Sequence, residues 1–417
     1  MIEKFPRGVV TPPPSKSLTH RAVVCAGLAR DRGSIGNFSS SADIEATIGG
    51  MRALRGAEFR VLGESLIVTP RGSGAGSGLS EVVDCAESGS TLRFLLPIAA
   101  LDERRTTFTG RGRLLGRPLG VYERVFLEMG ARFARTPDSV TVSGRLRGGV
   151  YSLPGDVSSQ FVSGLMMALP LLDGDSEIRL TTALESGGYV GLTMDVMRRF
   201  GVDVRADGSN YLIRGGSRYR CAEYRVEADY SQAAFFLAAA ALGLDVEVAG
   251  LNPESLQGDR EILRVLRDMG ADVEWSEDER GRTLVSVSAG DLEAVTLDAS
   301  GVPDLVPPVA VLCCFCRGTS RIVNAGRLRM KESDRLRALA SELRALGASV
   351  EEPGDSLAIT GAPRLRGGRA DAWGDHRIAM SMAVAAIRCD EPVALSGWRS
   401  VGKSYPRFWE DFERDGS

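Results

Sequence analysis

An internal repeat constrains the fold of this chain more than any other feature. In six segments, a polar or charged group precedes a run of small and apolar residues with the composition of a buried helix. Successive copies begin about 70 residues apart. The copies read SKSLTHRAVVCAGLA from Ser15, ESGSTLRFLLPIAA from Glu87, SSQFVSGLMMALPLL from Ser158, DYSQAAFFLAAAAL from Asp229, PDLVPPVAVLCC from Pro303 and GDHRIAMSMAVAAI from Gly374. This repetition predicts one supersecondary unit used six times.

A second pattern alternates with the first. Five segments read as the end of a helix, a glycine just after it, and then a strand of alternating apolar and polar residues. They are MRALRGAEFRV from Met51, FLEMGARFA from Phe126, VMRRFGVDVRA from Val196, VLRDMGADVEW from Val265 and ELRALGASVEE from Glu342. The sixth copy is missing, and RFWEDFERDGS stands in its place. Each full repeat is therefore expected to contain a strand, a polar-capped helix, a strand, a second helix and two more strands, which is an α/β arrangement.

The repeats predict two lobes. The chain has 417 residues, more than one hydrophobic core usually supports. Residues 5–13, FPRGVVTPP, read as a strand before the first repeat, and the sixth repeat lacks its final strands. We therefore expect the N-terminal strand to complete the C-terminal lobe. This closure gives a discontinuous lobe of residues 1–14 plus 228–417 and a continuous lobe of residues 15–227, with three repeats each and the active site in the cleft between them.

The starts of the repeated helices indicate what the cleft would bind. These helices are apolar on nearly all sides, so they are expected to be buried, with only their polar first residues reaching a surface. A helix N-terminus carries partial positive charge and unpaired N–H groups. Several such termini facing one cleft would attract anions.

Composition excludes several classes of protein. The net charge is −3, with 51 Lys and Arg, so no overall field attracts nucleic acid or a membrane surface. The most apolar stretch, residues 233–244, is shorter than the roughly 20 residues that span a bilayer. The first ten residues lack the apolar run of a signal peptide. We expect a cytoplasmic protein that acts without nucleic acid or membrane partners.

Metal and cofactor sites are not expected either. The seven cysteines form no pair of C-x-x-C units, and the CCFC run lies in an apolar segment typical of core thiols. His20 and His376 are the only histidines, too few for a metal site without carboxylates at ligand spacing. The Gly-rich run at 72–78 lacks the Lys-Ser/Thr of a phosphate loop, so a surface turn is expected there.

The first repeated helix carries the clearest candidate site. Lys16 lies at its start, and Ser17 and Arg21 are four residues apart on one face. Cations are disfavoured at a helix N-terminus, where Asp or Glu is usual, and a bound anion would resolve that conflict. We therefore interpret these residues as anion ligands rather than as a solvated face.

Other helix starts leave their alternatives open. One of Ser158 and Ser159 can cap its helix, which would leave the other hydroxyl and Gln160 as donors to a ligand. In MKESDRL, Lys331 and Arg335 would form a like-charge pair on a plain helix, offset by neighbouring acids or by a ligand.

Asp304 and Gly89 are candidates of another kind. Asp304 begins an apolar run, so it reads either as an N-cap or as a general base tuned by cations. Gly89, in ESGSTLR, would allow the backbone to approach a ligand closely.

Taken in order along the chain, these strings resemble the 5-enolpyruvylshikimate-3-phosphate synthase family of enolpyruvyl transferases. The matching strings are PSKSLTHRA, GSTLR, GRPL, DVSSQF, the Asp of VPDL, MKESDRL, GDHRIAM and SVGKSYP, and the resemblance covers essentially the whole chain, residues 9–412. The resemblance implies the two-lobed enolpyruvyl transferase fold, an inside-out α/β barrel of six βαβαββ repeats. It also implies a shikimate-pathway enzyme of chorismate and aromatic amino acid biosynthesis, a target of glyphosate, that needs no cofactor. It would act, as a monomer, on two small molecules, phosphoenolpyruvate and shikimate 3-phosphate.

The resemblance also assigns residues to these substrates. It implies that shikimate 3-phosphate is held by Lys16, Ser17, Arg21, Ser158, Ser159, Gln160, Ser186, Asp304 and Lys331, with Tyr189 near its ring. It implies that phosphoenolpyruvate meets Lys16, Gly89, Arg117, Gln160, Arg335, Arg377 and Lys403. Asp304, Glu332 and Lys16 match the catalytic residues. Glu87 and Arg327 stand where many members carry Asn, so neither is assigned a contact.

Two other functions fit the sequence less well. A UDP-N-acetylglucosamine enolpyruvyl transferase shares the fold, but that family carries a Lys-Asn pair near the N-terminus and a reactive loop Cys. Here Ser17 follows Lys16, and the loop at 111–117, RGRLLGR, has no Cys. A non-enzymatic repeat scaffold or nucleic-acid binder is disfavoured by the balanced charge and the absence of a basic stripe.

Overall fold

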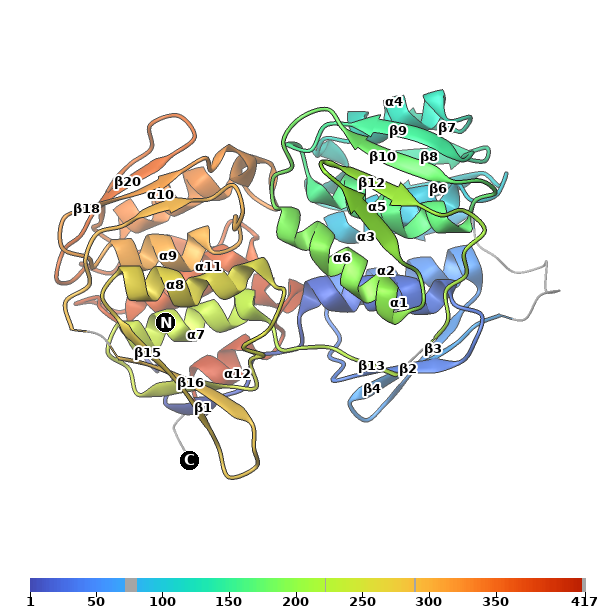
Figure 1. Ribbon diagram of the computed structural model, residues 1–417. Helices are drawn as coiled ribbons and strands as arrows, with labels where there is room; N and C mark the ends of the chain where they lie inside the picture. The colour runs from blue at the N-terminus through green and yellow to red at the C-terminus, as the bar shows by residue number, and fades with distance from the viewer. Residues whose placement is uncertain (72–80, 222, 289, 415–417) are drawn as a thin grey trace. The chain divides into compact units, whose positions relative to one another are not determined.

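The computed structural model describes residues 1–71, 81–221, 223–288 and 290–414, so the Gly-rich run at 72–78 lies outside the described residues (Figure 1). The chain divides into two compact units. We call Lys16–Val226 the continuous unit, and Met1–Ser15 together with Glu227–Ser417 the split unit.

The continuous unit contains three copies of one α/β repeat. Its α-helices are α1 (Lys16–Leu28), α2 (Ala42–Arg55), α3 (Gly89–Ala99), α4 (Gly120–Glu128), α5 (Ser159–Ala168) and α6 (Gly187–Arg199), with short 3-10 helices η1 (Leu114–Gly116) and η2 (Leu169–Leu171). Its strands are β2 (Gly33–Gly36), β3 (Glu58–Leu62), β4 (Ser65–Thr69), β5 (Val82–Asp84), β6 (Thr106–Thr109), β7 (Arg132–Arg135), β8 (Ser139–Ser143), β9 (Gly149–Leu153), β10 (Ser176–Leu180), β11 (Val204–Asp207), β12 (Asn210–Ile213) and β13 (Glu223–Arg225).

The three sheets of this unit share one pattern of pairing. Their strand orders are β13-β2-β4-β3, β5-β6-β8-β7 and β11-β12-β10-β9. In each sheet one parallel pair, such as β5 with β6, adjoins a run of antiparallel strands. A parallel pair needs a crossover, which α3 supplies between β5 and β6 and α5 supplies between β9 and β10. The first sheet takes its parallel partner, β13, from the end of the unit.

The split unit repeats this plan. Its helices are α7 (Tyr230–Ala241), η3 (Gly258–Glu261), α8 (Ile262–Asp268), α9 (Val306–Cys313), η4 (Gly326–Met330), α10 (Arg335–Ala345), α11 (His376–Ala386), η5 (Trp398–Lys403) and α12 (Phe408–Phe412). Its strands are β1 (Gly8–Val10), β14 (Val246–Ala249), β15 (Asp272–Glu277), β16 (Thr283–Ser288), β17 (Thr296–Asp298), β18 (Thr319–Val323), β19 (Ser349–Glu351), β20 (Leu357–Thr360), β21 (Gly368–Asp371) and β22 (Val393–Ser396).

The N-terminal strand joins this unit. Strand β1 pairs in parallel with β14, placing Gly8 opposite Val246, and the sheet runs β1-β14-β16-β15. The second sheet runs β17-β18-β20-β19, and the third contains only β21 and β22 among the described residues. This short third sheet follows from the missing sixth copy of the glycine-strand pattern. In the described part of the chain the sheets stay separate, and no closed barrel forms.

Buried helices form the centre of the split unit. All 12 residues of α7, all 8 of α9 and all 11 of α11 are buried. The three helices contact one another and lie side by side in Figure 1. Cys313, Cys314 and Cys316 are free thiols in this core, which confirms the interpretation of the CCFC run. Across the described ranges, no helix has both the length and the hydropathy to cross a lipid bilayer.

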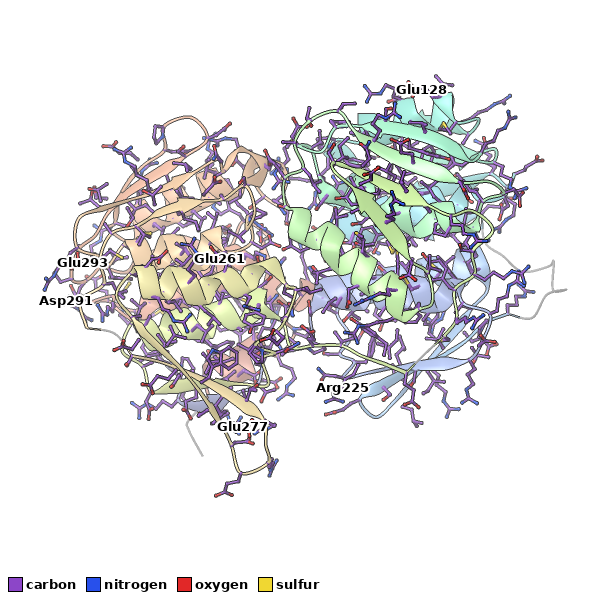
Figure 2. The ribbon with its side chains drawn as sticks, viewed as in Figure 1. Glu128, Arg225, Glu261, Glu277, Asp291 and Glu293 are labelled. Carbon is purple, nitrogen blue, oxygen red and sulfur yellow. The ribbon has the colours of Figure 1, made fainter. Side chains whose placement is uncertain are left out.

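Acidic side chains lie on the outside of this unit. Figure 2 labels Glu277, Asp291 and Glu293 at its outer edge. The side chains of Asp291 and Glu293 are 66% and 58% exposed, and both pair with Arg317. Arg335, Asp375 and Arg377 are, by contrast, buried at the starts of α10 and α11.

Candidate functional site

In the continuous unit, the starts of three buried helices carry predicted site residues. Helix α3 begins at Gly89 behind its cap Ser88, whose Oγ accepts from the backbone N–H of Thr91 at 3.1 Å. Helix α5 begins at Ser159 behind Ser158, whose Oγ accepts from the backbone N–H of Gln160 at 3.3 Å. Ser158 is therefore the cap, so the hydroxyl of Ser159 has no capping role, as the sequence allowed.

Helix α1 begins with Lys16 and has no acid in its first turn. The Nζ of Lys16 lies 2.8 Å from Oδ2 of Asp43, in the first turn of α2. Their side chains are 18% and 12% exposed. A carboxylate from the neighbouring helix thus supplies the negative charge that we expected from a ligand. An incoming anion would have to compete with Asp43 for Lys16.

Arg21 connects α1 to α6. Its Nε donates to Thr193 Oγ1 at 2.7 Å, its Nη1 to the backbone O of Ser17 at 2.7 Å, and its Nη2 to the backbone O of Tyr189 at 3.0 Å. Burial lowers the pKa of Arg21 to about 10. The guanidinium has five N–H groups, so a ligand contact would use those that these bonds leave.

Two guanidinium groups approach Gly89. A Cβ placed on Gly89 would lie 2.8 Å from Nη1 of Arg117 and 3.0 Å from Nη1 of Arg93. The same Cβ would lie 3.7 Å from Oε1 of Gln160, which accepts from Arg93 Nη1 at 2.7 Å. Gln160 Nε2 donates to Ser90 Oγ at 2.9 Å. Predicted residues Gly89, Arg117 and Gln160 therefore lie together, and like charges this close favour an anion between them.

Ser186 has a strained backbone. It precedes α6 with φ at +54°, in the left-handed region that non-glycine residues rarely adopt. Its side chain is buried and makes no capping bond to the helix. Strain of this kind gathers at functional positions, which agrees with the assignment of Ser186 to a ligand.

The split unit gathers its predicted residues around Asp304. Its Oδ1 lies 2.9 Å from Arg335 Nη1 and 3.6 Å from Lys331 Nζ. Its Oδ2 lies 3.1 Å from Arg377 Nη2, and its backbone O accepts from Arg377 Nη1 at 3.1 Å. Burial alone would raise the pKa of Asp304, but Arg377, Lys331 and Arg335 together hold it well below its usual range. The cap position of α9 is Leu305, so Asp304 is not an N-cap.

Arg335 is shared among three carboxylates. It lies 2.6 Å from Glu332 through Nη2 and 2.7 Å from Asp375 through Nε, in addition to its contact with Asp304. Its side chain is only 2% exposed. Burial alone would lower the pKa of Arg335, but Asp375, Glu332 and Asp304 raise it above its usual range. This guanidinium therefore stays charged and fixes the positions of Asp304 and Glu332.

Lys331 and Arg335 do not lie on one helix, as the sequence analysis had expected. Helix α10 begins at Arg335 behind its cap Asp334, so Lys331 lies before the helix, at the end of η4. The two cations are not neighbours on one helical face. They are brought together because both contact Asp304.

The start of α11 completes this group. Asp375 caps the helix by accepting from the backbone N–H of Arg377 at 2.9 Å. Lys403 Nζ donates to the backbone O of Gly374 at 2.7 Å, so it lies beside the same helix start. Arg327, where the family pattern differs, instead donates to the backbone O of Ser300 at 2.9 Å.

Sequence reasoning assigned no role to Arg93, Asp43 or Asp375. Arg93 stands inside a quoted motif, four residues after Gly89 on α3, and its helical spacing was the available signal. Asp43 had no such signal, because its partner is 27 residues away in the sequence. Within the described ranges, no group of three His, Cys, Asp or Glu residues could hold a metal ion.

Comparisons with known proteins identify relatives of the whole chain. The family model described as EPSP synthase (3-phosphoshikimate 1-carboxyvinyltransferase) matches residues 4–412. A 3-phosphoshikimate 1-carboxyvinyltransferase from Clostridium novyi is 43% identical over 427 residues, covering 98% of this chain and 95% of the relative. Another from Clostridium kluyveri is 45% identical over 410 residues, covering 97% of this chain and 94% of the relative.

Solved structures have the same fold. An EPSP synthase from Acinetobacter baumannii aligns with a TM-score of 0.79 at 25% identity, covering 98% of this chain and 95% of that one. The enolpyruvyl transferase NikO from Streptomyces tendae also gives a TM-score of 0.79, at 18% identity, covering 98% of this chain and 94% of that one. Both neighbours confirm the two-lobed enolpyruvyl transferase fold.

Proposed function

Because this chain belongs to the EPSP synthase (3-phosphoshikimate 1-carboxyvinyltransferase) family, we propose that it transfers the enolpyruvyl group of phosphoenolpyruvate to the 5-hydroxyl of shikimate 3-phosphate and releases phosphate. The observation that carries the proposal is the clustering of buried cations at helix starts in each unit, on the residues that the family pattern assigns to these two anions.

We assign shikimate 3-phosphate mainly to the continuous unit. The hydroxyls and amides at the starts of α1, α5 and α6 suit a phosphate and a carboxylate, because helix N-termini present unpaired N–H groups to anions. The assigned residues are Lys16, Ser17, Arg21, Ser158, Ser159, Gln160 and Ser186, joined by Asp304 and Lys331 of the split unit. The assignment therefore draws residues from both units.

We assign phosphoenolpyruvate to the guanidinium and ammonium groups. Arg117 and Gln160 beside Gly89 would hold its phosphate, together with Lys16 and Lys403. Arg335 and Arg377 would hold its carboxylate, because a guanidinium offers paired donors to a carboxylate. Both substrates carry several negative charges, and the reaction changes no oxidation state. We therefore expect these cations to supply the charge stabilisation that the transition state needs.

The chemistry proceeds by addition and then elimination. The 5-hydroxyl oxygen bonds to C2 of phosphoenolpyruvate while its proton passes to Asp304, and C3 takes a proton to give a tetrahedral intermediate. Loss of a proton from C3 re-forms the double bond as the C2–O bond to phosphate breaks, and the proton that Asp304 took passes to the leaving phosphate. We assign proton transfer at C3 to Glu332, and charge neutralisation on the phosphate to Lys16.

The low pKa of Asp304 is part of this proposal. In the free protein three cations hold that pKa well below its usual range, which makes the carboxylate a weak base. Anionic substrates that bind to the same cations would offset much of their field. The pKa of Asp304 would then rise, so the residue becomes a better proton acceptor once both substrates are bound.

Phosphate release tests the substrate pair. We expect the purified protein to release phosphate from phosphoenolpyruvate when shikimate 3-phosphate is added. Phosphoenolpyruvate alone, and phosphoenolpyruvate with UDP-N-acetylglucosamine, are the controls that should give background release. Release with the UDP-sugar instead would identify the other branch of the enolpyruvyl transferases, and background release in every arm would refute the proposal.

Gly89→Ala tests the phosphoenolpyruvate contacts. The added methyl would lie 2.8 Å from Arg117 Nη1 and 3.0 Å from Arg93 Nη1. The methyl would displace these guanidinium ends from the anion, and loss of a charge-assisted hydrogen bond costs about 1.5–3 kcal/mol. KM for phosphoenolpyruvate should therefore rise roughly 10- to 150-fold, with a smaller change for shikimate 3-phosphate. Gly116→Ala is the matched control, because nothing lies within 4 Å of a Cβ built there. Equal changes in both Michaelis constants would contradict the assignment of Gly89.

We also place the enzyme in the cytoplasm as a monomer. Every assigned contact comes from a single chain, so a second copy is not needed to complete either group of residues. Sedimentation of the purified protein at assay concentration tests the monomer.

A further inference from the structure

A buried carboxyl in the split unit has no place in the mechanism above. Asp259 lies in η3 and is only 3% exposed. Its Oδ2 accepts from the hydroxyl of Ser231, at the start of α7. Its Oδ1 is buried and has no hydrogen-bond partner among the described residues. A buried carboxylate with an unsatisfied oxygen is far more costly than a neutral carboxyl there.

The surroundings of Asp259 contain more negative than positive charge. Burial raises its pKa, Asp304 and Asp229 raise it further, and Arg377 and the Ser231 hydroxyl only partly oppose them, leaving it at about 7. Arg377 cannot fully compensate Asp259, because it already bonds to both the side chain and the backbone of Asp304.

The groups that face Asp259 come from several elements. Helix η3 contacts α7 and α8, and a Cβ placed on Gly258 would lie 3.9 Å from the backbone O of Gly301, in the loop that leads to Asp304. The titratable or charged groups on η3, α8 and the start of α7 are Asp229, Tyr230, Arg260, Glu261, Arg264, Arg267 and Asp268. Asp304 and Arg377 face Asp259 from outside these elements. Tyr230 donates to the backbone O of Asn252, and Arg264 pairs with Glu261 and Asp268. Asp304 and Arg377 are therefore the charges through which Asp259 can influence the ligand.

Charge balance indicates what Asp259 does. In the contacts around Asp304, three cations (Lys331, Arg335 and Arg377) face three carboxylates (Asp304, Glu332 and Asp375). An ionised Asp259 would add a fourth carboxylate. Its negative charge would draw on Arg377, which the proposed function assigns to the carboxylate of phosphoenolpyruvate.

We propose that Asp259 is a positioning residue that holds a proton on the acidic side of neutral pH and so keeps the charge of Arg377 available to Asp304 and to an anionic ligand. This inference rests on the proposed function for the identity of the ligand. When the pH rises, Asp259 loses its proton to solvent, and the added negative charge weakens binding of phosphoenolpyruvate. Turnover of the bound complex changes less, because Asp259 does not touch the reacting atoms.

The pH dependence of KM tests this role. For the wild-type protein, KM for phosphoenolpyruvate should rise about tenfold between pH 6.5 and pH 8.5, as expected for one charge acting over several ångströms at intermediate dielectric. In Asp259→Asn, which is neutral at every pH, that rise should disappear. Other ionisations are common to both proteins and cancel in the comparison. Asp291→Asn, at an exposed acid of the same unit, should behave as wild type.

Ser231→Ala is a second and milder variant. The Ser231 hydroxyl stabilises the charged form of Asp259, so its removal should strengthen proton binding. The rise in KM should then move to higher pH. General damage to the fold would not move the rise in KM to higher pH. Ser231→Ala therefore still tests the inference if Asp259→Asn fails to fold.

Infrared difference spectra separate this inference from the proposed function. The wild-type protein should show a protonated-carboxyl band that is lost between pH 6 and pH 9, and Asp259→Asn should lack it. This readout needs no turnover, so it stands even if the substrates are wrong. Absence of the band in wild type would overturn the inference. So would an unchanged KM profile in Asp259→Asn despite the band.

Discussion

Asp304→Asn is expected to lower kcat at least about 100-fold, which is the lower range for loss of a positioned proton acceptor. Asparagine has nearly the same size and can still accept from Arg335 and Arg377, but it cannot take the proton of the 5-hydroxyl. The change also removes a negative charge that now compensates three cations. Those cations should then bind anions more strongly, so we expect KM for phosphoenolpyruvate to fall.

The combination of lower kcat with lower KM distinguishes this role from a structural one. Steady-state kinetics at pH 7.5 give both values, and thermal unfolding checks that the variant is folded. Asp291→Asn is the control, because its side chain is 66% exposed in the same unit. Retention of more than a tenth of the wild-type kcat would show that Asp304 is not the proton acceptor. A higher KM with a lower melting temperature would point to a damaged fold instead.

The sequence predicted the repeated elements well because their signals are local. Asp229 and Ser158 each precede an apolar run, and each caps the helix that follows. The missing sixth glycine-strand pattern predicted an incomplete repeat, and the corresponding sheet contains only β21 and β22 in the described chain. Polar caps, glycines and alternation act within a few residues, so they can be recognised without tertiary structure.

Residues of the candidate site were predictable as types but not as partners. Lys16 was expected to face a bound anion, and it pairs with Asp43, from the next helix. Lys331 was read as a helical neighbour of Arg335, whereas the helix begins only at Arg335 and Asp304 joins the two cations. Such pairs depend on which helix starts pack together, and sequence spacing contains no information about that.

The protonation states of the buried acids could not be predicted from the sequence at all. Asp259 and Asp304 are both aspartates at or near helix starts, yet the pKa of one is raised and that of the other lowered. The difference arises because Asp304 contacts three cations, while Asp259 is buried beside other carboxylates. Only the packed arrangement determines which of two buried acids keeps its proton.

Lys16→Met is expected to lower kcat/KM at least about 100-fold for both substrates, as is typical when a preorganised charge is removed from a transition state. The ammonium group would neutralise phosphate charge as the C2–O bond breaks. Its loss also leaves Asp43, whose side chain is 12% exposed, without the partner that lies 2.8 Å away. An uncompensated carboxylate there would repel anions, so part of the loss could come from Asp43 alone.

The double variant Lys16→Met/Asp43→Asn separates the two effects, because it removes the ammonium group and its counter-ion together. If Lys16 acts on the substrates directly, kcat/KM of the double variant should stay at least about tenfold below that of wild type. Removing the charge of Asp43 should restore only the part of the loss that came from repulsion of the anionic substrates. Lys4→Met, at an exposed lysine of the split unit, is the control and should match wild type. Full recovery in the double variant would mean that Lys16 serves only to neutralise Asp43, and the assignment of Lys16 to the substrates would be wrong.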